Sequence, residues 1–115
     1  MKKLSIITLF ICGVVRIASA QTPGRAIPAA DVKTIDGKTI NTSTFSNNGK
    51  PIIISFWATW CKPCKKELDA ITEQYEDWVE QTGVKLIAVS IDDSRSASKV
   101  GADVKSKDWK FDIYI

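Results

Sequence analysis

The feature that most constrains the fold of this chain is a continuous apolar run that leads directly into a pair of cysteines. The segment PIIISFWATWCKPCKKEL begins at Pro51 and ends at Leu68. The apolar residues within 52–57 predict a strand buried on both faces, as in a parallel sheet. From Cys61, apolar side chains recur every three or four residues as far as Val79. This period predicts an amphipathic helix of about five turns.

The residues that follow extend this pattern into an α/β fold. Gly83 is a suitable end for the helix, and residues 84–91, VKLIAVSI, predict a second buried strand. Strand, helix and strand together predict a right-handed βαβ unit. Asp92 to Ser94 are suitable caps for a second helix that runs to about Lys107. The last seven residues, WKFDIYI, predict a further extended segment.

The first twenty residues have the three parts of a secretory signal peptide. They are a basic start, an apolar core from Leu4 to Val15, and a small-residue cleavage pattern at Ala18-Ser19-Ala20. Cleavage is therefore expected before Gln21. A membrane anchor is the alternative, although an apolar run interrupted by Arg16 is short for a bilayer span. A lipoprotein signal at Cys12 is disfavoured by the bulky residue before it.

Removal of residues 1–20 changes the charge of the chain. Three basic residues leave with that segment, so the basic residues fall from 16 to 13 and match the 13 acidic ones. A formally neutral chain gives no support to nucleic-acid or membrane-surface binding. Residues 21–30, which hold two prolines and a glycine, predict a linker. Residues 31–115 then form one domain, beginning with a hairpin that turns at Asp36-Gly37.

Several kinds of site use a cysteine pair with this spacing, and ligand counting separates them. A haem tether needs a histidine after the second cysteine, but Lys65 stands there and the chain has no histidine. A zinc site needs four ligands. After removal of residues 1–20 the chain has two cysteines, so two copies of the chain would have to share one ion. A structural staple stays open, although closing so short a loop removes little chain entropy. The position between a buried strand and a helix favours redox chemistry instead.

The helix start gives the two cysteines different surroundings. Cys61 falls at the N-cap or in the first turn, where unpaired N–H groups and the helix dipole favour a thiolate. Lys62 and Lys65 add positive charge, and Pro63 is suited to the first turn. Cys64 lies one turn further on the apolar face. The sequence thus predicts an exposed attacking thiol and a sheltered resolving thiol, the arrangement that thiol–disulfide exchange requires.

The motif FWATWCKPCKKEL, with the preceding DVKTIDGKTI and the following VKLIAVSIDD, resembles the thioredoxin superfamily, and most closely its TlpA/ResA-type exported members. The resemblance covers residues 31–115 and implies a thioredoxin-like α/β fold. It also implies an exported, periplasmic or otherwise extracytoplasmic thiol–disulfide oxidoreductase. Cys61 would attack, Cys64 would resolve, and the two would form a disulfide. Implied partners are disulfide-containing protein substrates and a membrane-bound thiol electron donor, without a cofactor or a metal.

The resemblance extends to residues around the pair. Trp57 and Trp60 match aromatic residues beside the family's site; we expect Trp57 to pack and Trp60 to shape the exposed surface. Glu67 matches an acidic residue proposed to assist proton transfer, and it borders the apolar stripe of the helix. If shielded, it would be suited to general-base catalysis; the alternative is a solvated helix charge. Cytoplasmic thioredoxins carry a buried acid at the position of Ser55.

The sequence departs from the family after the cysteine pair, because no proline follows Cys64. By resemblance, a complete thioredoxin fold continues with a cis-proline loop, a β-hairpin and a last helix, and we expect these parts to be missing from this chain. We expect a truncated portion of a longer protein, with an open sheet edge and an uncovered sheet face. Two other functions stay open. One is a thiol peroxidase, in whose family VSIDD also occurs, and the other is a non-catalytic module whose disulfide is a staple.

Overall fold

A computed structural model describes residues 26–115. The predicted signal peptide, its alternatives and the first half of the predicted linker lie outside the described residues. The elements, in chain order, are β1 (Asp31–Lys33), β2 (Thr39–Asn41), the 3-10 helix η1 (Thr42–Thr44), β3 (Ile52–Trp57), α1 (Lys62–Thr82), β4 (Lys85–Ser90), the 3-10 helix η2 (Ala97–Lys99), α2 (Val100–Ser106) and β5 (Asp112–Tyr114).

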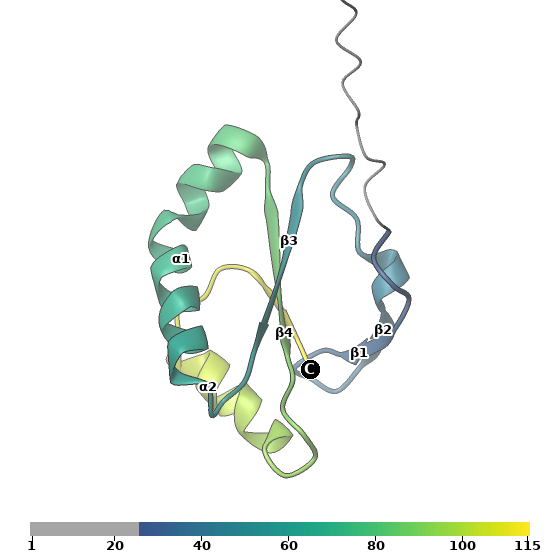
Figure 1. The fold of residues 1–115 in the computed structure, drawn as a ribbon, viewed down its shortest axis with the longest axis vertical. Helices are drawn as coiled ribbons and strands as arrows, with labels where there is room; N and C mark the ends of the chain where they lie inside the picture. Colours follow the sequence, from purple (N-terminus) through teal and green to yellow (C-terminus); the bar gives the residue numbers. More distant parts are fainter. Residues whose placement is uncertain (1–25) are drawn as a thin grey trace, which may run out of the picture.

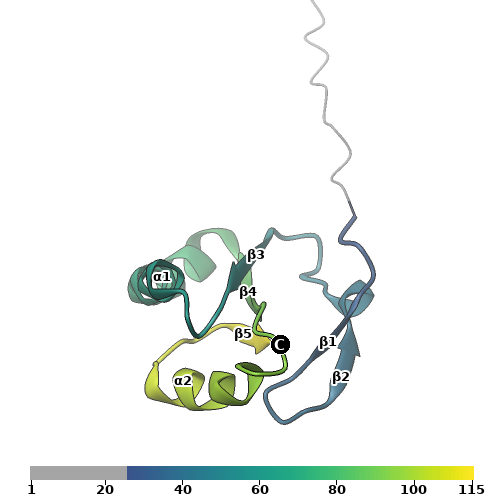
Figure 2. The ribbon, with the colours of Figure 1, turned by 60° about the horizontal axis from the view of Figure 1, so that its bottom comes forward.

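The centre of the fold is a parallel sheet with the strand order β3-β4-β5. β3 and β4 are parallel, with Ile52 opposite Lys85 and Trp57 opposite Ser90. The predicted βαβ unit is therefore confirmed. β5 adds to β4, also in parallel. Two right-handed crossovers that step in the same direction place their helices on the same face of a sheet, and Figures 1 and 2 show α1 and α2 on one side.

The predicted hairpin forms from β1 and β2, which pair antiparallel. Its turn contains Gly37, whose φ of 89° lies in the region that favours glycine. The hairpin lies on the side of the sheet opposite the helices (Figure 2). It is fastened to the end of β5, since Lys33 and Ile115 exchange backbone hydrogen bonds of 2.7 and 2.8 Å. These bonds join the small sheet to the large one.

The hydrophobic core lies between the helices and the sheet. Aromatic contacts are prominent in it: Trp57 meets Trp109 edge to face at 5.0 Å, and Tyr75 meets Phe111 in the same way at 5.7 Å. The expectation that Trp57 packs is confirmed, because only 1% of its surface is exposed. The buried members of the cluster are Trp57, Leu68, Tyr75, Leu86, Ala88, Val100 and Phe111.

Two sequence predictions about the sheet and its second helix need correction. β3 is not buried on both faces, because Ile53 and Phe56, which point to opposite faces of the strand, are 43% and 63% exposed. Within the described residues it is also an edge strand. The open edge itself was expected. The second helical segment also starts later than predicted, at Ala97. Asp92 does not cap it, because its carboxylate accepts from residues that precede it in the chain. Asp93, another of the expected caps, does accept from the N–H of Ser96 at 3.2 Å, directly before the helical segment.

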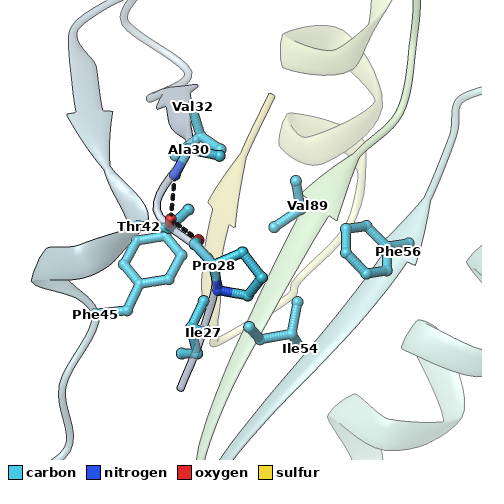
Figure 3. A pocket seen from close by; sticks show the side chains of 9 residues that line it. All are labelled: Ile27, Pro28, Ala30, Val32, Thr42, Phe45, Ile54, Phe56 and Val89. Atoms are coloured by element: carbon cyan, nitrogen blue, oxygen red, sulfur yellow. Dashed lines mark hydrogen bonds between the residues drawn. The ribbon is translucent and has the colours of Figure 1, made fainter. Parts of the chain in front are cut away.

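The face of the sheet opposite the helices carries an apolar cavity of about 460 Å³, shown in Figure 3. Residues of the predicted linker close one side of it. Thr42 holds them in place: its Oγ1 accepts from the N–H of Ala30 at 2.8 Å and donates to the carbonyl of Pro28 at 2.7 Å. The lining residues are Ile27, Pro28, Ala30, Val32, Thr42, Phe45, Ile54, Phe56 and Val89, and neither cysteine is among them.

Candidate redox site

The junction between β3 and α1 is formed by a short turn and a helix cap. After Trp57 the chain turns, and the N–H of Cys61 donates to the carbonyl of Ala58 at 3.0 Å. Cys61 is the N-cap of α1, with extended φ and ψ of −91° and 90°. Its sulfur accepts from the N–H of Cys64 at 3.3 Å. Pro63 lies in the first turn. The predicted helix start is thus confirmed.

The two cysteines are joined as a disulfide, with their Cα atoms 5.3 Å apart. Both are partly buried, so the prediction of an exposed Cys61 is wrong in degree. The asymmetry lies instead in the surroundings, because Cys64 packs against the core cluster whereas Cys61 caps the helix end. The first turn can stabilise an anion on Cys61 but offers Cys64 no equivalent.

The predicted surface around the pair is present in part. Trp60 is 65% exposed, directly before Cys61. Lys62 and Pro63 are also exposed. Lys65, expected to add positive charge, instead forms an ion pair of 3.0 Å with Asp103 of α2. Both Lys62 and Lys65 were expected to favour the thiolate. Lys65 pairs with Asp103 instead, whereas Lys62 takes no part in this contact between the helices.

Glu67 does not have the shielding that a general base would need. It is exposed on α1, although the next residue, Leu68, is fully buried. Ser55 in β3 is partly buried and supplies no carboxylate beneath the pair. The exposure of Glu67 favours the alternative of a solvated helix charge, and its part in proton transfer stays a prediction.

A carboxylate that the sequence reasoning missed lies beside the junction. Asp92, two residues after the end of β4, accepts from the backbone N–H of Thr59 at 2.9 Å and from its hydroxyl at 2.6 Å. It also accepts from the hydroxyl of Ser90 at 2.6 Å. We call these three residues the Asp92 clamp. The sequence held a signal for this contact. The βαβ prediction makes the two strands neighbours, and Thr59 and Asp92 each follow the carboxyl end of one of them.

The Asp92 clamp favours the ionised form of its carboxyl group. Burial opposes ionisation, but the hydrogen bonds from Ser90 and Thr59 outweigh it and hold the pKa of Asp92 below its ordinary value. The clamp is therefore anionic at neutral pH. Within residues 26–115, no group of three or more histidine, cysteine or acidic side chains is placed to hold a metal ion.

The fold and the junction define the class to which this domain belongs. A parallel βαβ unit with a Cys-x-x-Cys pair at the start of its helix is a thioredoxin-like arrangement. The chain is similar to a solved thioredoxin-like protein from Porphyromonas gingivalis, with a TM-score of 0.66 and 50% identity, over 76% of this chain and 57% of the other. The AhpC/TSA family model matches residues 23–114. The chain therefore belongs to the AhpC/TSA family.

Two similar proteins are named as thiol-disulfide oxidoreductases. The chain is 35% identical to thiol-disulfide oxidoreductase ResA of Bacillus thuringiensis, over 96% of this chain and 66% of that protein. It is 32% identical to sporulation thiol-disulfide oxidoreductase A of Bacillus subtilis, over 99% of this chain and 70% of that protein. The chain thus spans about two thirds of these two relatives. Within residues 26–115, no helix has the length and apolar character needed to cross a bilayer.

Proposed function

We propose that this protein is a thiol–disulfide oxidoreductase of the exported thioredoxin-like type. The observation that carries the proposal is the placement of Cys61 at the N-cap of α1, where its sulfur meets the N–H of Cys64. A helix N-terminus stabilises a thiolate. The names of the relatives, thiol-disulfide oxidoreductases in both cases, support the same reaction.

The reaction proceeds in two exchanges of sulfur. In the reductive direction, the Cys61 thiolate attacks one sulfur of a substrate disulfide, and the other substrate sulfur leaves as a thiolate that takes up a proton. The Cys64 thiolate then attacks the Cys61 sulfur of the mixed disulfide. This releases the second substrate thiol and leaves the Cys61–Cys64 disulfide. Two electrons pass to the substrate, so an external dithiol must reduce the pair before the next cycle.

The surroundings of the pair support this division of roles. Cys64 contacts the core cluster from the first turn of α1, so it is held close to Cys61 and away from a bound substrate. A resolving thiol in this place attacks the mixed disulfide within the same molecule, which is faster than attack by a thiol of a second molecule. Trp60 and Lys62 are exposed beside Cys61 and form the surface that a substrate would meet. Glu67, three residues after Cys64 on α1, is the candidate proton acceptor for the Cys64 thiol.

The wider setting of the protein is also proposed. We infer that residues 1–20 direct export and are cleaved before Gln21, that residues 21–30 are a linker, and that residues 31–115 belong to the thioredoxin-like domain. An oxidising compartment outside the cytoplasm would oxidise the pair readily. Disulfide-containing proteins are the proposed substrates, and a membrane-bound thiol carrier is the proposed electron donor. No soluble cofactor takes part in this scheme.

The proposal is tested by reduction of insulin disulfides with dithiothreitol as the electron source. We expect turnover by the wild-type protein and none by Cys61→Ser. Peroxide consumption is measured in parallel, and a rate above that of insulin reduction would favour a thiol peroxidase. Equilibration of the pair with glutathione buffers gives a further test. A disulfide that exchanges with neither glutathione nor dithiothreitol would make the pair a structural staple.

A further inference from the structure

The Asp92 clamp connects two segments that are distant in sequence but adjacent at one end of the sheet. Thr59 and Asp92 are 33 residues apart. Trp57 and Ser90, the last residues of β3 and β4, lie opposite each other in the parallel register. The backbone adds a further link there, because the N–H of Ile91 donates to the carbonyl of Trp57 at 2.8 Å. The turn that precedes Cys61 is therefore fastened to the end of β4.

The contacts of the carboxylate are directed at the turn and not at the cysteines themselves. Asp92 receives both donors of Thr59, the backbone N–H and the hydroxyl, and Thr59 is two residues before Cys61. The same turn is closed by the hydrogen bond from the N–H of Cys61 to the carbonyl of Ala58. Fixing Thr59 thus limits how far the helix cap can move. Ser90, which is buried, donates its hydroxyl to Oδ2 of Asp92, the same oxygen that accepts the backbone N–H of Thr59.

We propose that Asp92 is a positioning residue for the redox pair, which it serves by fixing the Thr59 turn so that the Cys61 sulfur stays at the N-terminus of α1. This inference rests on the proposed function. Its consequence is chemical as well as structural. A cap that moves away from the helix end loses part of the interaction with the first-turn N–H groups, so the thiolate of Cys61 becomes less favoured.

Two substitutions separate this role from a purely electrostatic one. Thr59→Val removes the hydroxyl with little change of shape or charge, at a position that is partly exposed. Asp92→Asn removes the negative charge and replaces one of the two oxygens that accept from Thr59 and Ser90 with an NH₂ group. Thr59→Ser keeps the hydroxyl and serves as the rescue variant. Asp93→Asn is the matched control, because Asp93 contacts Arg95 and Ser96 on the exposed side of the loop.

The readout is the rate at which iodoacetamide alkylates Cys61 in the reduced protein, followed against pH by mass spectrometry of the peptide. We expect Thr59→Val and Asp92→Asn each to raise the pH midpoint of alkylation by about half a unit, and to slow alkylation at pH 7 about threefold, as loss of a helix-end interaction predicts. Thr59→Ser should restore most of the wild-type midpoint. Asp93→Asn should leave it unchanged.

Other outcomes would overturn the proposal. If Asp92 acts only through its charge, Asp92→Asn lowers the midpoint and Thr59→Val leaves it in place. If the clamp only stabilises the loop, both variants unfold at lower urea concentration while the midpoint stays at the wild-type value. Because alkylation needs no substrate, this test is independent of insulin turnover. A wild-type protein that fails to reduce insulin would contradict the proposed function without deciding the role of Asp92.

Discussion

The substitution Leu68→Ala tests the face on which α1 packs, and therefore the placement of Cys64. Leu68 is fully buried in the core cluster, one turn after Cys64. Residues four apart share one face of a helix, so the orientation that buries Leu68 also turns Cys64 towards the core. The substitution removes three carbons, at about 0.8 kcal/mol each in transfer free energy. A residual cavity adds about 1 kcal/mol, which gives an expected loss of about 3–4 kcal/mol.

Urea unfolding followed by tryptophan fluorescence measures this loss. Both proteins are kept oxidised so that the disulfide contributes equally. With a slope of about 1–3 kcal/mol per molar urea, the midpoint should fall by roughly 1–4 M. Glu67→Ala is the matched control at the neighbouring exposed position, and it should change the free energy of unfolding by at most about 0.5 kcal/mol. A loss below about 1 kcal/mol for Leu68→Ala, or an equal loss for both variants, would refute the assigned helix face.

Three further substitutions test other contacts. Tyr75→Phe leaves the buried N–H of Leu86 without the phenolic oxygen that accepts it at 3.1 Å, so urea unfolding should show a loss of about 1–3 kcal/mol. The hydrogen bond from Lys107, opposed by burial, holds the pKa of Asp69 below its ordinary value. The ionised Asp69 therefore stabilises the folded state above about pH 4, and this stabilisation is lost as the pH falls through the folded-state pKa. Asp69→Asn should thus be less stable than the wild type at pH 7, by at most about 1 kcal/mol because the carboxylate is 42% exposed. The free energies of unfolding of the two proteins, measured in urea, should converge in acid. A difference that stays constant with pH would contradict this. Since Glu67 is exposed, Glu67→Gln should keep insulin reduction within about twofold, whereas a loss of tenfold or more would assign it the proton transfer.

The strand–helix–strand core could be predicted from sequence because its signals are local. Apolar period separates strand from helix, and the residues suited to the two ends of α1 lie in the sequence where the helix begins and ends. Cys61 caps the start, and Gly83 ends the helix with a φ of 67°, a conformation that favours glycine. The expectation that Trp57 packs and that Trp60 lies at the surface came with the family resemblance instead, and both residues lie as expected.

The exposure of β3 could not be predicted in this way. A continuous apolar run shows that a strand is suited to burial, but its actual burial depends on which segments lie beside it. In the described residues β4 flanks one edge of β3, and the other edge is open. Glu67 illustrates the same limit, because the helical period places it at the border of the apolar face without showing whether any neighbour covers it.

The Asp92 clamp was missed because a capping preference is judged from nearby residues. Asp92 precedes a helical segment and resembles a cap, yet its carboxylate is satisfied by Thr59, far back in the chain. Contacts of this range are set by strand register, which brings the carboxyl ends of β3 and β4 together. The βαβ prediction contained this neighbourhood, but the choice between a local cap and a distant partner depends on the three-dimensional arrangement.

The most direct test of the central claim is to trap the mixed disulfide in the full chain. Cys64→Ser removes the resolving thiol but leaves Cys61 at the helix N-cap, so a substrate disulfide should stay covalently attached to Cys61. Non-reducing electrophoresis and mass spectrometry of the linked peptide would identify the bond. We predict stable adducts with Cys64→Ser and none with Cys61→Ser. Adducts formed by Cys61→Ser alone would reverse the roles of the two cysteines and contradict the account.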